Sequence, residues 1–381
     1  MIYLNNAATT LQKPPEVAQA VLDAMANAGS SSRGASADDL AAARSVAGAR
    51  LRVARLLGFE HPERVAFTLN ATMALNTAIF GLLRPGDHVI TTDFEHNSVL
   101  RPLNELERRG VIEVDHLPAD SAGHLHTEDL DGMFRPNTRA IIATHASNLT
   151  GAVVDVAALA RVAHAHGAVS VLDAAQSLGC IPVNMGAIGA DIVCFTGHKA
   201  LMGPQGTGGL AVSPGVELVP LVHGGTGVKS AEPLQPESYP EHLEAGTMNA
   251  QGLAGLAAAL DVLLDLGVER VEEHERALRS RFVDRLGQIP GVEVYGIHDG
   301  HDHTGVVAMN LAGLDSSTLA DRLAYDYGIA TRAGLHCAPR MHAALGTLDR
   351  GAVRFSFGWY TTEHDVDAAL DALCHIAREV G

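Results

Sequence analysis

Basic residues are scarce in this sequence of 381 residues. Lys and Arg together number 27 against 44 Asp and Glu, which gives a formal net charge of −17 at pH 7. So acidic a surface repels polyanions, and we therefore expect neither nucleic acid nor an anionic membrane as a partner. The low number of basic residues does not exclude a local phosphate-binding site, because backbone N–H donors matter more at such a site than the net charge of the protein.

Cysteine is scarce as well. The four cysteines are Cys180, Cys194, Cys337 and Cys374, and no two of them have the CxxC spacing. This pattern argues against a disulfide framework and is typical of a reducing compartment. We also predict no metal site, because the run HDGHDH at 298–303 has no helical spacing to aim its ligands and is typical of a solvated loop.

Long apolar runs are missing too. The most apolar helix that we expect, 252–267, is interrupted by Asp261 and Asp265 and is too short to cross a bilayer. The first residues lack the basic and apolar regions of a secretory signal. The composition therefore favours a cytoplasmic protein with no membrane span.

The sequence does contain a regular alternation of apolar runs and helical patterns. Short β-branched runs predict strands at 65–68, 88–91, 112–116, 140–145, 169–173 and 192–196. Helical patterns separate most of them, which is typical of βαβ units and a largely parallel sheet, so the predicted fold class is α/β.

One of the predicted helices is expected to begin after Ser36, which acts as its N-cap. Its predicted apolar stripe is Leu40, Ala43, Ala47, Leu51, Ala54 and Leu57.

Beyond residue 291 the pattern changes. Short strands are predicted near 292–295, 305–311 and 352–357, with helices near 316–326 and 362–379. A chain of this length exceeds the usual size of one core, so we predict two domains. The large domain is 15–250, and the small α+β domain consists of 1–14 and 251–381.

Two predicted strands carry reactive side chains at their carboxyl ends. The strand 169–173 ends on Asp173, with Gln176 shortly after it, and the strand 192–196 leads into His198 and Lys199. Ligands of open α/β sheets bind outside the carboxyl ends of the strands, so we expect these side chains to converge on one site. Taken alone, Asp173 also fits a strand-end cap and Lys199 a surface lysine.

An acid and a lysine in one site match the needs of pyridoxal phosphate. Its aldehyde forms a Schiff base with a lysine amine, and its ring nitrogen needs a carboxylate partner if the ring is to accept electrons. A buried Asp173 beside that nitrogen keeps it protonated, because opposite charges at close range each favour the charged form.

The sequences DAAQ at 173–176 and TGHK at 196–199 resemble the class V aminotransferase branch of fold-type I pyridoxal phosphate enzymes. The cysteine desulfurase and selenocysteine lyase family is the most similar, and the resemblance runs from 3–9 to the C-terminal helix. It implies a mostly parallel seven-stranded sheet in the large domain, a smaller C-terminal α+β domain and a homodimer with composite active sites.

The resemblance also assigns cofactor-binding residues. Ala71 and Thr72 match the phosphate-binding turn, and His96 matches the histidine that stacks on the pyridine ring and also exchanges protons near neutral pH. The other matching positions are Asn148 and Gln176 at the phenolic oxygen, Asp173 at the ring nitrogen, Thr196 and His198 at the phosphate, Lys199 at the aldehyde, and Thr247 at the partner subunit's phosphate. From the residues alone, these turns also fit an ordinary capped helix, a structural histidine and an N-cap threonine.

A second group of residues lies near the C-terminus. Cys337 occurs in a loop bounded by Gly and Pro, beside His336 and near Arg332 and Arg340, and cationic neighbours favour a thiolate. It matches the family's sulfur-accepting cysteine, and only 16 residues separate it from Arg354, which resembles the SUF-type branch. An arginine within an apolar strand needs a partner, and its fork matches an α-carboxylate. We expect Arg354 to bind the substrate carboxylate with help from Arg332 and Asn148.

The sequence therefore predicts a pyridoxal phosphate-dependent cysteine desulfurase that converts L-cysteine to L-alanine. Lys199, Cys337 and His96 are the predicted catalytic residues, and a persulfide on Cys337 passes to a sulfur-acceptor protein. Selenocysteine lyase activity uses the same residues, and another class V reaction, such as transamination or C–S cleavage of a thioether, stays open. A scaffold without catalysis is a further alternative. Asn70, Met73 and Ser36 depart from the family pattern.

Overall fold

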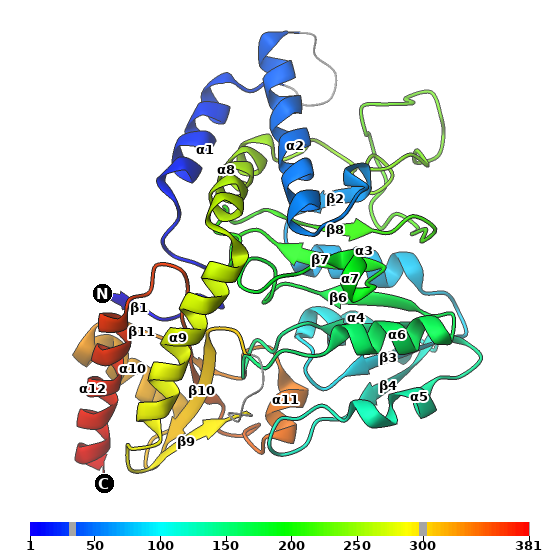
Figure 1. Cartoon of the computed structure of the whole chain (residues 1–381). Helices are drawn as coiled ribbons and strands as arrows, with labels where there is room; N and C mark the ends of the chain where they lie inside the picture. Colours follow the sequence, from blue (N-terminus) through cyan, green and yellow to red (C-terminus); the bar gives the residue numbers. More distant parts are fainter. Residues whose placement is uncertain (30–35, 297–302, 381) are drawn as a thin grey trace.

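The computed structural model describes residues 1–29, 36–296 and 303–380 of the chain. Its largest element is a seven-stranded sheet with the strand order β2-β8-β7-β6-β5-β3-β4 (Figure 1). The strands are β2 (Val65–Thr68), β3 (Asp87–Thr92), β4 (Ile112–Leu117), β5 (Thr138–Thr144), β6 (Val169–Asp173), β7 (Ile192–Thr196) and β8 (Gly208–Val212). Neighbours from β7 to β4 are parallel, whereas β8 is antiparallel to β2 and β7. The predicted α/β class and mostly parallel seven-stranded sheet are confirmed.

Strand β8 is the one strand of this sheet that the sequence pattern did not reveal. It begins with Gly208 and Gly209, which carry no side chain to show a β pattern. A Cβ on Gly208 would lie 2.7 Å from the Cα of Asn70 and 2.9 Å from the carbonyl oxygen of Phe195. Only glycine therefore lets β8 pass between β7 and the turn that follows β2.

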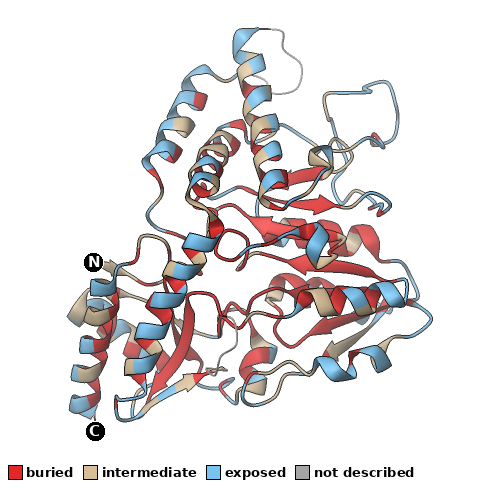
Figure 2. Cartoon of the chain, viewed as in Figure 1, coloured by how far each residue is buried: buried red, intermediate tan, exposed pale blue. Residues whose placement is uncertain are grey.

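Helices cover both faces of the sheet. One face carries α3 (Ala71–Leu82) and α4 (Asn97–Arg108), and the other carries α2 (Ala37–Leu56), α6 (Val156–Ala165), α7 (Met185–Ile188) and α8 (Ala250–Leu266). Side chains of a strand alternate between the two cores, as Ile141 and Ile142 of β5 do. The strands are accordingly the most continuously buried elements (Figure 2). Helix α1 (Pro15–Asn27) packs against α8 beside α2, and α5 (Leu130–Met133) precedes β5.

The predicted apolar stripe of α2 is mostly wrong, although Ser36 is its N-cap as expected and accepts a hydrogen bond from the backbone N–H of Asp39. Leu40 and Leu51 are exposed. The buried side chains of α2 are Ala42, Val46, Ala49, Arg50, Val53 and Ala54, so of the predicted stripe only Ala54 and the C-cap residue Leu57 are buried. Small residues allow α2 to pack closely against α8, so the tertiary contact selects a different face from the largest apolar side chains.

The C-terminal part forms a four-stranded antiparallel sheet with the order β12-β13-β10-β9. Its elements are α9 (Val268–Leu286), β9 (Val292–Tyr295), β10 (Val306–Leu311), α10 (Ser316–Tyr327), β11 (Ile329–Ala330), β12 (Arg332–Gly334), α11 (Pro339–Ala344), β13 (Ala352–Ser356) and α12 (Glu363–Val380). The N-terminal strand β1 (Ile2–Tyr3) pairs with β11, and Leu4 is buried in the core that contains Phe282 and Phe355. The division into domains 15–250 and 1–14 with 251–381 stays a prediction.

No single helix in the described ranges is long and apolar enough to cross a bilayer. Helices α8 and α9, which bend by 79° relative to each other, meet the length and composition requirements only when taken together.

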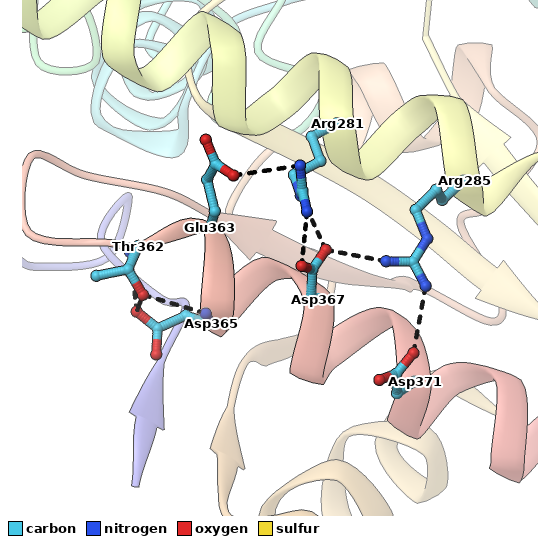
Figure 3. A network of polar contacts seen from close by, with 7 residues as sticks. All are labelled: Arg281, Arg285, Thr362, Glu363, Asp365, Asp367 and Asp371. Carbon is cyan, nitrogen blue, oxygen red and sulfur yellow. Dashed lines mark hydrogen bonds and ion pairs between the residues drawn. The ribbon is translucent and has the colours of Figure 1, made fainter.

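A charge network joins α9 to α12 (Figure 3). Asp367 accepts hydrogen bonds from Arg281 at 2.7 and 2.8 Å and from Arg285 at 2.9 Å, and these neighbours lower the pKa of its carboxyl group. Arg281 also lies 3.2 Å from Glu363, and Arg285 lies 3.2 Å from Asp371. Asp367 is thus the one carboxylate in this network that serves both arginines.

This arrangement predicts unequal effects of two matched substitutions on thermal stability. Asp367→Asn removes the shared acceptor charge and should lower the melting temperature by about 1–2 °C, with the loss shrinking in high salt because exposed ion pairs are screened. Asp371→Asn removes a single contact and should change less. Thermal unfolding of both variants at low and high salt measures the difference, and an equal loss in both would contradict the central role of Asp367.

Candidate active site

A cavity of about 240 Å³ lies at the carboxyl ends of the central strands. Strand β6 delivers Asp173 and β7 delivers Thr196 as their last residues. The cavity wall contains the predicted residues Ala71, Thr72, His96, Asn148, Asp173, Gln176, Thr196, His198, Lys199, Arg332 and Arg354. The wall does not include Cys337 or Thr247. The convergence expected from the strand ends is therefore present.

Lys199 and Asp173 form the electrostatic centre of the cavity. Burial, with smaller contributions from the nearby Arg354 and Arg332, lowers the pKa of the Lys199 ammonium to about 8, although Asp173 opposes the shift. Burial raises the pKa of Asp173, whose Oδ1 accepts a hydrogen bond from the backbone N–H of Ala175 at 2.9 Å. A cation placed beside Asp173 would favour its ionised form, so the carboxyl group suits a protonated ring nitrogen.

The start of α3 forms another wall of the cavity. Asn70 caps this helix by accepting a hydrogen bond from the backbone N–H of Met73 at 3.0 Å, and its φ of −175° is extended. Asn70 therefore acts as the N-cap and needs no left-handed conformation. The first N–H groups of a helix have no partner within it, which makes the Ala71–Thr72 turn suitable for an anion.

His96 is held as a neutral ring. Its Nδ1 accepts a hydrogen bond from the backbone N–H of Ser98 at 3.0 Å and lies 2.7 Å from the Ser98 hydroxyl. Burial and the nearby cations, Lys199 first among them, lower the pKa of His96 to about 4. The expectation that His96 exchanges protons near neutral pH is thus not supported, whereas a flat neutral ring remains suitable for stacking.

Arg354 is fully buried on β13. Its Nη1 donates to the carbonyl oxygen of Asn148 at 2.8 Å, and its Nη2 donates to Oδ1 of Asn5 at 3.2 Å. Burial and the charge of Arg332, which lies opposite Arg354 in the β12–β13 register, lower its pKa to about 9. No carboxylate bonds to it among the described residues, so the guanidinium keeps capacity for an anionic ligand.

Cys337 lies just outside the cavity wall, on a loop that two large-sheet turns hold in place. Asn97 donates its backbone N–H to the carbonyl oxygen of Cys337 at 2.8 Å, and Nδ2 of Asn148 donates to the carbonyl oxygen of His336 at 2.6 Å. His336 and Cys337 have φ values of 51° and 58°, in the left-handed region that non-glycine residues avoid. The contacts from both turns hold this unfavourable backbone.

Arg340 does not act as the free cationic neighbour that the sequence suggested for Cys337. Its Nε lies 2.6 Å from Oδ1 of Asp93, and this ion pair offsets its charge. The cationic surroundings of the cavity come instead from Lys199, Arg332 and Arg354.

Thr247 lies apart from the cavity of Lys199. It is exposed, and it lines a second cavity of about 280 Å³ together with Leu69, Met73, Leu221 and Val222. Thr247 is not the N-cap of α8 either, because Asn249 fills that position. Of the stretch that departs from the family pattern near Ser36, residues 33–35 lie outside the described part of the chain.

Sequence reasoning missed a buried acid, Glu95, next to His96. Its Oε1 accepts hydrogen bonds from the hydroxyl of Thr92 at 2.6 Å and the backbone N–H of Thr144 at 2.9 Å. Complete burial raises its pKa to about 8, and Asp173 adds to this rise. Glu95 is therefore protonated at neutral pH and adds no negative charge beside Asp173. The signal available in the sequence was an acid three residues after a buried strand, in the turn that carries His96.

The described ranges contain no group of three or more His, Cys, Asp or Glu side chains that is arranged to hold a metal ion. Most of the 298–303 run lies outside these ranges, and only His303 is described.

The model of the class V aminotransferase family matches residues 2–369. The chain belongs to this family. A probable cysteine desulfurase of Methanothermobacter thermautotrophicus is 36% identical, with 99% of this chain and 94% of the relative covered, and the cysteine desulfurase CsdA of Escherichia coli is 32% identical over 98% and 93%. The apo structure of a cysteine desulfurase from Thermococcus onnurineus NA1 superposes with a TM-score of 0.93 at 31% identity, over 99% and 95% of the two chains.

The cavity of this class V aminotransferase fits pyridoxal phosphate, the cofactor that the family implies. Thr196 Oγ1 and Asn148 Oδ1 are buried without a hydrogen-bond partner among the described residues, so the cavity wall holds polar atoms that need a ligand. A buried amine, a buried carboxyl group and a helix N-terminus supply the remaining chemistry.

The lowered pKa of Lys199 predicts how cofactor uptake depends on pH. Only the neutral amine attacks an aldehyde, and its fraction rises about tenfold per pH unit below the pKa and levels off above it. Mixing apoprotein with pyridoxal phosphate should therefore give uptake rates that rise up to about pH 8 and then level off. The visible absorption of the lysine-bound cofactor follows the reaction, with Lys199→Ala as the control that shows none. A rate that stays flat between pH 6.5 and 9 would contradict the assignment.

Proposed function

We propose that this class V aminotransferase is a pyridoxal phosphate-dependent cysteine desulfurase that converts L-cysteine to L-alanine and carries the sulfur as a persulfide on Cys337. One observation carries the proposal. Asn148 lies in the cavity wall, its carbonyl oxygen accepts from Arg354, and its side-chain amide donates to the residue before Cys337. A single residue thus joins the carboxylate-binding guanidinium to the loop of the sulfur acceptor.

The cavity residues divide the work among themselves. When bound, the cofactor supplies an electron sink for charge that develops at the substrate Cα. Asp173 holds the proton of the ring nitrogen, and the turn at Ala71 and Thr72, with Thr196 and His198, holds the phosphate. Thr247 binds the phosphate of the partner subunit. The neutral ring of His96 stacks on the cofactor, and Asn148 and Gln176 face its phenolic oxygen.

The remaining side chains act on the substrate. Arg354, with Arg332, binds the α-carboxylate, which places the Cα near Lys199. The Lys199 amine holds the cofactor and moves the proton at Cα. The Cys337 sulfur attacks the substrate sulfur, so the Cβ–S bond breaks, an S–S bond forms, and a proton is added at Cβ. L-cysteine and the Cys337 thiol thereby become L-alanine and a Cys337 persulfide, with atoms and electrons balanced.

The working form is a homodimer with composite active sites. Support comes from the second cavity, where Thr247 lies among exposed Leu69, Leu221 and Val222. Exposed apolar side chains around a cavity are typical of a protein interface, and a second copy of the chain is the occupant. The acceptor of the persulfide is a separate thiol-bearing protein of the cytoplasm, and the short Cys337–Arg354 interval supports the SUF-type branch.

The desulfurase proposal predicts the behaviour of Cys337→Ala. Holoenzyme with L-cysteine and a thiol reductant should release alanine and sulfide in equal amounts, and the variant should lose about 100-fold or more of this activity because the nucleophile is gone. The matched control is Cys374→Ala, which removes another partly exposed cysteine. Alanine release that survives in Cys337→Ala would sink the persulfide step.

The same variant separates the alternatives. Selenocysteine turnover that greatly exceeds cysteine turnover in the wild type and persists in Cys337→Ala would indicate a selenocysteine lyase. Turnover of thioethers or 2-oxo acids without turnover of cysteine would indicate another class V reaction. If no cofactor absorption appeared at all, the chain would be a scaffold.

The dimer proposal predicts that a charge in the second cavity disrupts both assembly and cofactor binding. Val222→Glu should shift the protein from dimer to monomer and weaken pyridoxal phosphate binding by about 3–10-fold, because Thr247 no longer reaches the partner's phosphate. Val380→Glu makes the same change at an exposed valine on α12 and should leave both unchanged. Sedimentation and cofactor titration give the two readouts. A Val222→Glu dimer with normal cofactor affinity would refute the composite site.

A further inference from the structure

The segment Asn5–Lys13 contacts both ends of the cavity, yet the proposed mechanism uses none of its residues. It leaves β1, passes along β13 and then crosses to the loop after β7. We propose that this segment is a positioning element, which holds the peptide of His198 and Lys199 at one end and the guanidinium of Arg354 at the other. The inference rests on the roles proposed above for these three residues.

At the lysine end, donors from the segment converge on two successive carbonyl oxygens. The carbonyl oxygen of His198 accepts from the backbone N–H of Thr10 at 3.1 Å, from Nζ of Lys13 at 3.0 Å and from the Thr9 hydroxyl at 3.2 Å. The carbonyl oxygen of Lys199 accepts from the Thr10 hydroxyl at 2.8 Å. Thr10 is buried, so these bonds are shielded from water. The backbone that carries the reactive amine is therefore held by hydrogen bonds from this segment to the carbonyl oxygens of His198 and Lys199.

Thr9 also holds the ring of His198. The Thr9 hydroxyl lies 3.0 Å from Nδ1 of His198 while it donates to the carbonyl oxygen of the same residue at 3.2 Å. Burial lowers the pKa of His198 to about 4, so the ring that Thr9 contacts is neutral near pH 7. Thr9 therefore orients a neutral ring that lines the cavity.

At the other end, the segment is fixed to β13. The backbone N–H of Ala7 donates to the Ser356 hydroxyl at 2.9 Å, and Nδ2 of Asn6 donates to the Ser356 carbonyl oxygen at 3.0 Å. Asn5 forms a parallel bridge with Ser356, and its Oδ1 accepts from Nη2 of Arg354. A neutral acceptor orients the guanidinium without cancelling its charge, which leaves the charge for a substrate carboxylate.

The middle of the segment faces the cavity. Ala7 and Ala8 line its wall, and the Ala7 carbonyl oxygen accepts from Nε2 of Gln176 at 3.1 Å. One short segment therefore relates the lysine, the histidine and the arginine to each other. The distance between the amine and the guanidinium decides where a bound amino acid places its Cα.

Binding experiments on holoenzyme variants test the arginine end. L-alanine is the probe, because it has the α-carboxylate but no sulfur to transfer. Asn5→Ala should weaken L-alanine binding by about 3–10-fold, and Asn5→Asp, although isosteric, should weaken it more, because its carboxylate competes for Arg354. Pyridoxal phosphate affinity should be unchanged in both. An Asn5→Asp enzyme that binds L-alanine as well as the wild type would overturn this half of the inference.

Cofactor titrations of the apoprotein test the lysine end. Thr9→Val should weaken pyridoxal phosphate binding by about 3–10-fold, and Thr10→Val should shift the pH midpoint of the absorption of the lysine-bound cofactor. Thr9→Ser and Thr10→Ser keep the hydroxyl groups and should restore wild-type values. If both valine variants lower only the melting temperature, the segment is merely structural and the inference fails.

Two further variants separate this inference from the proposed function. Lys199→Ala should abolish the absorption of the lysine-bound cofactor, and Arg354→Ala should abolish L-alanine binding. If these two variants behave like the wild type, the proposed roles are wrong. If they behave as stated while the Asn5, Thr9 and Thr10 variants resemble the wild type, only the positioning role of the segment is refuted.

Discussion

Burial of two cations beside one carboxyl group in the same cavity is the constraint on which the site depends. Lys199 and Arg354 both have pKa values lowered by burial, to about 8 and about 9, and Asp173 has a raised pKa from the same cause. Uncompensated buried charge is costly, so the protein alone leaves the cavity short of negative charge. In the proposed function, the cofactor phosphate and the substrate carboxylate would supply that charge, and a protonated ring nitrogen would give Asp173 a partner. The cavity is thus built for its ligands.

The surrounding polar groups orient the Arg354 guanidinium and add no further charge beside Lys199 and Asp173. Asn148 and Asn5 contact Arg354 through neutral oxygens, so they orient the guanidinium without neutralising it. Glu95 is protonated near neutral pH because of its burial, so it adds no second negative charge beside Asp173. His96 is neutral for the same reason. Desolvation therefore determines the protonation states of these two neighbours of Lys199 and Asp173.

The fold delivers these groups from segments far apart in the chain. Parallel strands bring the turns after β3, β5, β6 and β7 to one edge of the sheet, and the antiparallel pair β12 and β13 brings Arg332 and Arg354 to the same cavity. The Cys337 loop has few contacts of its own with the cavity and is held through Asn97 and Asn148. Cys337 is thereby tied to the turns after β3 and β5, which also carry the cavity residues His96 and Asn148.

The sequence by itself determined the elements and most of the cavity residues. Buried strands such as 169–173 and 192–196 have continuous β-branched runs, and their ends carry Asp173 and the His198–Lys199 pair. Such signals are local, because a few neighbouring residues are enough to indicate a strand and the reactive side chains at its end. The α/β class and the convergence at the strand ends follow from them.

Only the tertiary structure decided the rest. Strand β8 begins with two glycines, Gly208 at a close approach to Asn70 and Gly209 at a close approach to Ala66 and Phe195, and no local pattern shows these contacts. The buried face of α2 was chosen by α8, not by its largest apolar residues. The protonation of Glu95, the pairing of Arg340 with Asp93 and the contacts of Thr10 beneath Lys199 all depend on residues distant in sequence. Burial and long-range pairing are properties of the folded chain, so the sequence pattern alone does not contain them.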